Sequence, residues 1–121
     1  MLKYCIQSHH AKRAGHHWDF RLQKPNSDMM WSWVIPKHRL PSKGERLLAI
    51  KVQDHPIDWC KFEGEIEEGY GAGKVDLVDM DSYSFVSNAS SKKCFELDGE
   101  VDGKYCLVRM GNTNKWLIIP K

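Results

Sequence analysis

The chain has 121 residues, which is enough for one domain, over residues 1–121, with a single hydrophobic core. Its 18 Lys and Arg residues nearly balance 16 Asp and Glu residues, so the net charge does not indicate a nucleic-acid-binding protein, and any basic surface must be local. No apolar run could span a membrane and the N-terminal sequence does not resemble a signal peptide, so we expect a monomeric cytoplasmic protein.

Short β-rich runs recur along the chain at intervals typical of a β-sandwich or a β-barrel. In chain order, the expected strands are 4–7, 18–23, 31–35, 47–52, 73–78, 82–86, 93–97, 105–110 and 116–119. Helical periodicity is weak, with room for one helical turn at 42–48 and another at 62–68. A closed barrel leaves no unpaired sheet edge. We therefore predict a mainly β fold, a compact closed β-barrel of about eight strands with short helical turns and long loops.

A histidine-rich segment at 8–22 contains four of the six histidines of the chain, just ahead of Asp19 and Arg21. If the end of this segment is a strand, His17, Asp19 and Arg21 share one face, and the aromatic and aliphatic residues between them share the other. Neighbours on one face lie roughly 7 Å apart, so an imidazole and a carboxylate can bind one metal ion there. The pattern indicates a metal site beside a fixed cation.

The candidate metal ligands are His9, His17 and Asp19. Two imidazoles and a carboxylate suit a divalent transition metal and leave coordination positions open. A lone histidine is more often an ordinary surface or core residue, but the clustering favours the metal site. His10 and His16 are alternatives to His9 and His17. Strand alternation favours His17 because it shares a face with Asp19, and the spacing does not choose between His9 and His10.

Basic residues near this segment are candidate phosphate ligands. The planar guanidinium of Arg21 can bind a phosphate through two parallel hydrogen bonds and keeps its charge. His55 is expected at the end of a strand, because Pro56 cannot continue the hydrogen-bonded ladder, and it could contact a phosphate or protonate a leaving group. Lys37 and Arg46 are further candidates, although either one alone is more often a solvated charge.

Two other sequence features are interpreted as structural. The glycine-rich run 68–73 lacks the Lys-Ser/Thr ending of a nucleotide-binding loop, so we expect a tight bend with glycines at positive φ. The four cysteines are far apart and form no CxxC pair, so we expect buried free thiols and no zinc knuckle. The cysteines are Cys5, Cys60, Cys94 and Cys106.

Motifs that carry a family resemblance run in order over nearly the whole chain. They are Gln7-Ser8-His9-His10-Ala11, His17-Trp18-Asp19-Phe20-Arg21-Leu22, Trp31-Ser32-Trp33-Val34-Ile35-Pro36-Lys37, Arg46-Leu47, Gln53-Asp54-His55-Pro56-Ile57-Asp58-Trp59, Phe62-Glu63-Gly64-Glu65-Ile66, Tyr70-Gly71-Ala72-Gly73-Lys74-Val75, Leu107-Val108-Arg109 and Trp116-Leu117. Together they resemble the 3′-phosphoesterase module of bacterial DNA ligase D. The His-aromatic-Asp-Phe-Arg and Asp-His-Pro segments are the most specific.

The resemblance implies a compact β-barrel with a manganese-dependent activity on the 3′ end of a nucleic-acid strand. Such a module removes a 3′-terminal ribonucleoside from a primer–template and then hydrolyses the resulting 3′-phosphate to a 3′-OH, in the repair of broken ends by non-homologous joining. Carried over by position, the resemblance implies that His9, His17 and Asp19 bind the metal. Arg21 and His55 would bind the phosphate, with His55 also a candidate general acid. Lys37 and Arg46 would contribute to activity, and Trp59 and Gln7 would contact the substrate.

Two departures from the family pattern affect these expectations. The interval between His9 and His17 is two residues longer than in well-known members, which keeps His10 and His16 open as ligands. Trp59 stands where the family has a tyrosine, and an indole has no hydroxyl to act as an acid or base, so the second step is expected to be weaker.

The expected partners are a DNA or RNA/DNA primer–template 3′ end and a separate ATP-dependent ligase and polymerase, because the module is expected to stand alone. The alternative function is a non-catalytic barrel that binds nucleic-acid ends.

Overall fold

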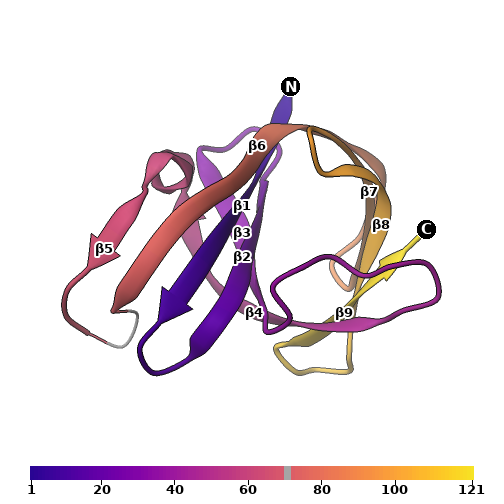
Figure 1. Ribbon diagram of the computed structural model, residues 1–121. Coiled ribbons are helices and arrows are strands. Elements are labelled where there is room, and N and C mark those ends of the chain that lie inside the picture. Colours follow the sequence, from indigo (N-terminus) through magenta and orange to yellow (C-terminus); the bar gives the residue numbers. More distant parts are fainter. Residues whose placement is uncertain (70–71) are drawn as a thin grey trace.

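The computed structural model describes residues 1–69 and 72–121, which form an antiparallel β structure (Figure 1). In chain order the elements are β1 (Leu2–Ala11), β2 (Gly15–Gln23), β3 (Met29–Ile35), β4 (Leu47–Pro56), the 3-10 helix η1 (Ile57–Lys61), β5 (Gly64–Ile66), β6 (Gly73–Asn88), β7 (Lys92–Asp98), β8 (Asp102–Arg109) and β9 (Lys115–Pro120).

Eight of the strands close into a barrel. Neighbouring strands pair in the order β1-β2-β3-β4-β9-β8-β7-β6, and β6 also pairs with β1, which closes the sheet. Within the described residues, the short strand β5 pairs only with β6 and lies outside this ring, at the left of Figure 1. Closure gives each of these eight strands a neighbour on both sides. The predicted closed β-barrel is therefore confirmed.

The strands differ from the prediction in two places. Expected strands at 73–78 and 82–86 are one continuous strand, β6, which passes a bulge where Ile6 pairs with Asp79 and Gln7 with Leu77. The bulge accommodates one extra residue without ending the ladder. The short strand β5 was not predicted.

The predicted helical turns at 42–48 and 62–68 are wrong. The first segment contains a turn followed by the start of β4, and the second contains β5. A helix forms instead at η1, immediately after Pro56, whose extended backbone ends β4 and caps the helix. In the expected glycine bend, Gly69 and Gly73 have positive φ, and Tyr70 and Gly71 lie outside the described residues.

The hydrophobic core fills the inside of the barrel. Alternation on β2 and β3 sends Phe20, Leu22, Trp33 and Ile35 inward, where they meet large side chains from β1, β6 and β7. The intervening residues of β2 and β3 therefore face outward. This outward face of β1 to β4 carries the histidine-rich segment.

The expectation of free thiols is wrong, because two disulfides join the four cysteines. Cys94 and Cys106 are direct partners in the ladder between β7 and β8. Cys5 of β1 is joined to Cys60 of η1, and the Cys60 sulfur also lies 3.1 Å from the Met30 sulfur. Sequence separations of 12 and 55 residues gave no sign of these contacts, since the fold alone brings the pairs together.

Among the described residues, helical structure is too short to cross a membrane.

Candidate metal and phosphate site

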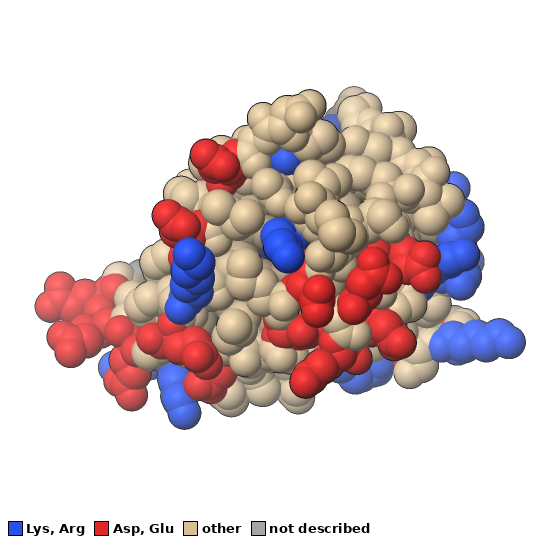
Figure 2. Space-filling model, turned by 90° about the horizontal axis from the view of Figure 1, so that it is seen from above, with Lys and Arg blue, Asp and Glu red and all other residues tan. Residues whose placement is uncertain are grey.

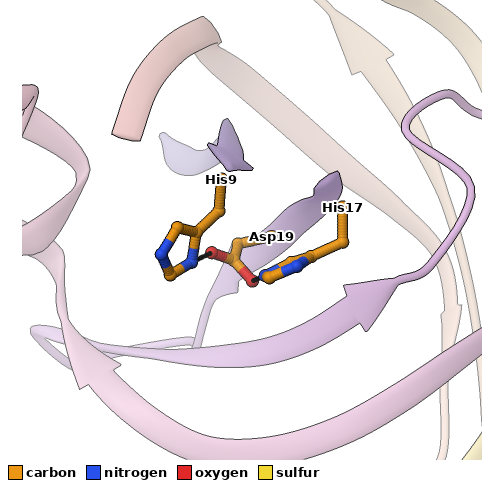
Figure 3. A group of neighbouring side chains, drawn as sticks. All are labelled: His9, His17 and Asp19. Atoms are coloured by element: carbon orange, nitrogen blue, oxygen red, sulfur yellow. Dashed lines mark ion pairs between the residues drawn. The ribbon is translucent and has the colours of Figure 1, made fainter. Parts of the chain in front are cut away.

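Three side chains that could hold a metal ion converge on the outward face of the β1–β2 hairpin (Figure 3). His9 of β1 lies opposite His17 of β2, and Asp19 follows two residues along β2 on the same face. Asp19 Oδ2 lies 3.5 Å from His9 Nδ1, and Asp19 Oδ1 lies 3.3 Å from His17 Nε2. The candidate ligand atoms of the three residues all lie within 4.8 Å of one another. Register and alternation together therefore assemble this group.

The Asp19 carboxylate is held in its charged form. Burial raises its pKa, but hydrogen bonds from His17 and His9 and the charge of Arg21 together outweigh burial and hold the pKa well below its usual range. A carboxylate and two imidazoles, all mostly buried, form a donor set that fits a divalent transition metal. The carbonyl oxygen of Gly15 lies 3.2 Å from His17 Nδ1 and fixes the orientation of that ring.

His10 and His16, the alternative ligands, lie on the other face of the hairpin. Their rings stack on each other with centroids 3.7 Å apart, and His38 stacks on His16 at 4.1 Å. His16 Nε2 also lies 2.6 Å from Ser8 Oγ. In the part of the chain that the structure describes, these rings are not part of the group formed with Asp19.

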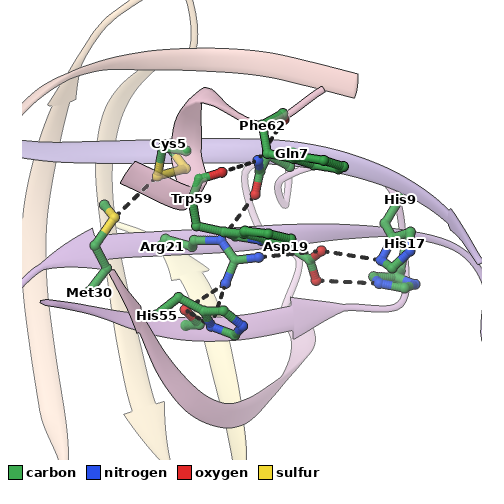
Figure 4. Close-up of polar contacts among 12 residues, drawn as sticks. Cys5, Gln7, His9, His17, Asp19, Arg21, Met30, His55, Trp59 and Phe62 are labelled. Atoms are coloured by element: carbon green, nitrogen blue, oxygen red, sulfur yellow. Dashed lines mark hydrogen bonds and ion pairs between the residues drawn. A yellow bond between two sulfur atoms is a disulfide. The ribbon is translucent and has the colours of Figure 1, made fainter. Parts of the chain in front are cut away.

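Arg21 is the next residue on the same face of β2, and its guanidinium is almost fully buried. The residue is 3 % exposed. Nη1 donates to Ser32 Oγ at 2.8 Å, Nε donates to Gln7 Oε1 at 3.1 Å, and Nη2 lies 3.7 Å from Asp19 Oδ2 (Figure 4). Burial lowers the pKa of Arg21 and Asp19 raises it, but a guanidinium keeps its proton in proteins. The site therefore contains a permanent cation beside the candidate metal-binding group.

His55 stands beside Arg21, near the end of β4 as predicted. Its Nδ1 lies 2.9 Å from Arg21 Nη1 and 3.3 Å from Ser32 Oγ. Burial and then the charge of Arg21 lower the pKa of the imidazole, so the neutral ring is favoured. Since the guanidinium can only donate, Nδ1 accepts and the proton of the neutral ring is on Nε2. His55 can therefore donate through Nε2.

Gln7 forms hydrogen bonds both to Arg21 and to the backbone of the η1 segment. It is fully buried, and its Nε2 donates to the carbonyl oxygens of Trp59 and Phe62 at 2.9 and 3.1 Å. Its Oε1 accepts from Arg21. The two rings of Trp59 and Phe62 stack with centroids 4.8 Å apart. Gln7 thus connects the guanidinium to the segment that carries Trp59.

A cavity of about 530 Å³ joins the polar residues to an apolar wall. Its polar part contains the candidate metal-binding group, Arg21 and His55. The apolar part comes largely from alternate residues of β3 and β4, with Trp59 and residues of β5 and β6. The lining residues are His9, Ala11, Ala14, His17, Asp19, Arg21, Val34, Pro36, Ile50, Val52, His55, Trp59, Ile66 and Val75.

Three predicted site residues lie outside this lining, as far as the described residues go. Lys37 follows Pro36, Arg46 stands just before β4, and both are exposed. Gln7 lies behind the cavity, where it contacts Arg21 and the backbone of the η1 segment. The structure therefore places His9, His17, Asp19, Arg21, His55 and Trp59 around one cavity and these three around its periphery.

Sequence reasoning missed Ser32 and the aliphatic wall. Ser32 pairs with Arg21 across the β2–β3 ladder, and its hydroxyl contacts both Arg21 and His55. Alternation on β3 could have placed Ser32 on the outward face. The ladder register that puts it opposite Arg21 is a tertiary feature, which no local signal gives.

Comparison with known families gives one match over most of the chain. Residues 7–109 match the family described as the DNA Ligase D 3'-phosphoesterase domain. The matched range includes each candidate ligand, Arg21, His55 and the η1 segment.

Curated relatives match over nearly the full length of the chain. It is 34% identical over 129 residues to the multifunctional non-homologous end joining protein LigD of Pseudomonas aeruginosa, with 98% of this chain and 15% of the relative covered. It is 36% identical over 120 residues to the LigD proteins of Mycobacterium bovis and Mycobacterium tuberculosis, with 94% of this chain and 15% of each relative covered. The chain thus spans about 15% of the length of these relatives.

Proposed function

The chain belongs to the DNA ligase D 3′-phosphoesterase domain family, and on this premise we propose that it is a metal-dependent phosphoesterase acting on the 3′ end of a nucleic-acid strand. The observation that carries the proposal is the convergence of His9, His17 and Asp19 with Arg21 and His55 on one cavity. A metal-binding group beside a fixed cation and a neutral imidazole is suited to phosphoryl transfer.

The proposed reaction has two hydrolytic steps on a primer–template. In the first, water cleaves the phosphodiester bond before a 3′-terminal ribonucleoside, which leaves with a free 5′-hydroxyl and exposes a 3′-phosphate. In the second, water cleaves this phosphomonoester to give inorganic phosphate and a 3′-OH. The relatives are named for non-homologous end joining, and we assign this chain to the same repair of broken ends.

The proposed metal is Mn²⁺, held by His9, His17 and Asp19. Bound there, it would supply positive charge to a phosphate oxygen and acidify water. Arg21 would bind other phosphate oxygens and stabilise the negative charge that develops in the transition state. His55, neutral with its proton on Nε2, would donate a hydrogen bond from Nε2 to the phosphate. To act as general acid for the leaving oxygen it would first have to take up a second proton and become an imidazolium.

The remaining predicted residues have proposed roles that follow from their positions. Gln7 positions Arg21 and the η1 segment and does not contact substrate. Lys37 and Arg46, at the periphery, would bind phosphates beyond the scissile one. Trp59 and the aliphatic wall would contact the departing nucleoside, because an apolar surface with a stacked aromatic pair suits a base and its sugar.

The charge of the surface is consistent with local rather than general attraction of nucleic acid. Acidic side chains gather in several groups on the face seen from above (Figure 2). Phosphates are repelled from such a face, so the basic residues around the cavity have to provide the attraction. We further propose a monomer in the cytoplasm that hands the healed end to a separate ATP-dependent ligase and polymerase.

The test is incubation of the purified protein with a labelled primer–template that ends in one ribonucleotide, with Mn²⁺, other divalent metals or a chelator. We expect Mn²⁺-dependent loss of the ribonucleoside, followed by conversion of the 3′-phosphate to a 3′-OH. His10→Ala is the matched control for His9→Ala, because both remove a histidine from β1 but only His9 lines the cavity. Binding of the substrate without product under any metal would instead support a non-catalytic end-binding barrel.

A further inference from the structure

A second cavity, of about 520 Å³, lies on the opposite face of β3 and β4 from the first. Ile50 and Val52 line the first cavity, whereas Lys51, between them on β4, lines the second. Consecutive residues of a strand point to opposite faces, so one layer of sheet separates the two spaces. The lining residues of the second cavity are Trp31, Trp33, Lys51, Ser90, Lys93, Arg109, Asn112, Thr113, Asn114 and Trp116.

The lining of this cavity is strongly biased toward positive charge. Lys51, Lys93 and Arg109 contribute three cations, and the described lining contains no carboxylate. Asp54, outside the lining, lies 3.4 Å from Lys51 Nζ, but it also forms an ion pair with Lys24. One carboxylate is therefore shared between two lysines, and the cavity has an excess of cations.

Lys93 is the most unusual of these cations because it is buried, with 6 % of the residue exposed. Its Nζ donates to Asn88 Oδ1 at 2.7 Å and to the Ala89 carbonyl at 3.2 Å, and it lies 3.9 Å from the centre of the Trp31 ring. These three partners are all neutral. Burial and then the charges of Lys51 and Lys24 lower the pKa of Lys93. A buried cation without a counter-ion is costly, and an anion in the cavity would offset that cost.

In the described part of the chain, the indole N–H of Trp33 is a second buried group in this cavity that lacks a partner, in this case a hydrogen-bond acceptor. It is fully buried, and its Nε1 is the one buried side-chain nitrogen or oxygen of the described residues that lacks a hydrogen-bond partner. Buried indole N–H groups usually find an acceptor. The exposed side chain of Arg109 is already oriented, because its Nε donates to the Thr113 carbonyl at 2.8 Å.

We propose that this second cavity is a binding site for a phosphate group carried by a nucleotide, with Lys51, Lys93 and Arg109 as its cationic ligands. A volume of about 520 Å³ exceeds the needs of a bare phosphate. Three tryptophans provide apolar surface for a sugar or base, and the side chains of Asn112 and Asn114 can bond base edges. The nucleotide can be a residue of a nucleic-acid strand or a free molecule, and only the first source rests on the proposed function.

The test is an NMR titration that follows the indole N–H signals of metal-free protein. Trp33 reports the second cavity and Trp59 reports the first. The probes are adenosine 5′-monophosphate, adenosine without phosphate, and a short oligonucleotide. We expect saturable shifts of the Trp33 signal with the two phosphate-bearing probes and an affinity at least about tenfold lower for adenosine, since a charge-assisted contact is lost. Tighter binding of the oligonucleotide would identify a strand as the ligand, and equal binding would identify a free nucleotide.

The variants separate the site from general charge effects. Arg109→Gln, an exposed change that should not disturb folding, is expected to weaken the Trp33 response about tenfold. Lys92→Gln is the matched control, because Lys92 is exposed, adjacent to Lys93 on β7, and outside the cavity lining. Equal loss in both variants, or shifts at Trp59 without shifts at Trp33, would overturn the proposal. Hydrolysis plays no part in this readout, so failure of the proposed enzymatic function would not be mistaken for failure of this site.

Discussion

The guanidinium of Arg21 lies against the imidazole of His55, with 2.9 Å between Nη1 and Nδ1. Arg21 is buried and His55 is half-buried beside the Ser32 hydroxyl, and they come from β2 and β4, which do not pair with each other. The contact determines which nitrogen of His55 carries the proton and makes protonation of the ring unfavourable. The proposed phosphate site therefore works as a pair of coupled side chains.

Arg21→Lys should remove most of the activity while preserving the charge. A lysine ammonium cannot contact Gln7, Ser32 and a phosphate in the planar arrangement of the guanidinium. Loss of such a preorganised donor costs about 10²–10³ in kcat. Steady-state assays on a 3′-phosphate oligonucleotide would measure this effect. Lys92→Arg, which also exchanges a lysine and an arginine but lies away from the site, is the control. Retention of more than about half of the activity in Arg21→Lys would argue against phosphate binding by the guanidinium.

The pKa of His55 in metal-free protein should lie below its ordinary value of 6.5, because burial and the charge of Arg21 both oppose protonation. At pH values between the His55 pKa of the folded protein and 6.5, the unfolded chain therefore binds more protons than the folded one. The free energy of unfolding falls as the pH is lowered through this range. NMR titration of the His55 ring would measure the pKa, and urea unfolding at several pH values would measure the linkage. His55→Gln should flatten the pH dependence, and a pKa above 6.5 would contradict the coupling.

The two disulfides should differ in their effect on activity. Replacing either pair by serine is expected to cost about 2–4 kcal/mol of stability. Only Cys5–Cys60 holds η1, whose segment carries Trp59 and the carbonyls bonded by Gln7. The Cys5→Ser/Cys60→Ser variant should therefore lose both stability and activity, whereas Cys94→Ser/Cys106→Ser should lose only stability at temperatures where it remains folded. Thermal unfolding and assays at 20 °C below each Tm would separate the two effects. Equal activity in the two variants would contradict a positioning role for η1.

Trp59→Tyr should favour the second reaction step over the first. The substitution introduces a hydroxyl near His55, whose ring centre lies 6.2 Å from that of Trp59. A phenol can donate to or accept from a phosphomonoester, whereas an indole can only donate. We expect a severalfold rise in the ratio of phosphomonoesterase to phosphodiesterase activity, consistent with one added hydrogen bond of about 1 kcal/mol. Trp59→Phe, which lacks the hydroxyl, is the control. A similar ratio in the two variants would remove the hydroxyl as the cause.

The local part of the site could be predicted from sequence because strand alternation determines it. His17, Asp19 and Arg21 share a face as expected, and His55 lies near the end of its strand, immediately before Pro56. The choice between His9 and His10 needed the β1–β2 register, which places His9 opposite His17. Local spacing contains no information on register when two histidines are adjacent.

Most of the strands were also predictable, because turn residues separate runs of alternating pattern. The continuous β6 was expected as two strands, 73–78 and 82–86, but its ladder with β1 continues past a bulge through the residues between them. The acidic segment containing β5 shows no hydrophobic pattern and pairs only by joining β6. Ser32 and the disulfides depend on contacts between distant segments, which no window of the sequence displays.

The measurement that tests the central claim most directly is titration of the protein with Mn²⁺ followed by electron paramagnetic resonance. The claim predicts one tightly bound ion per chain, lost in Asp19→Ala because the remaining imidazoles no longer form a three-ligand set, and retained in His10→Ala. Circular dichroism would confirm that both variants are folded. Unchanged Mn²⁺ binding by folded Asp19→Ala would contradict the assignment of this group as the metal site.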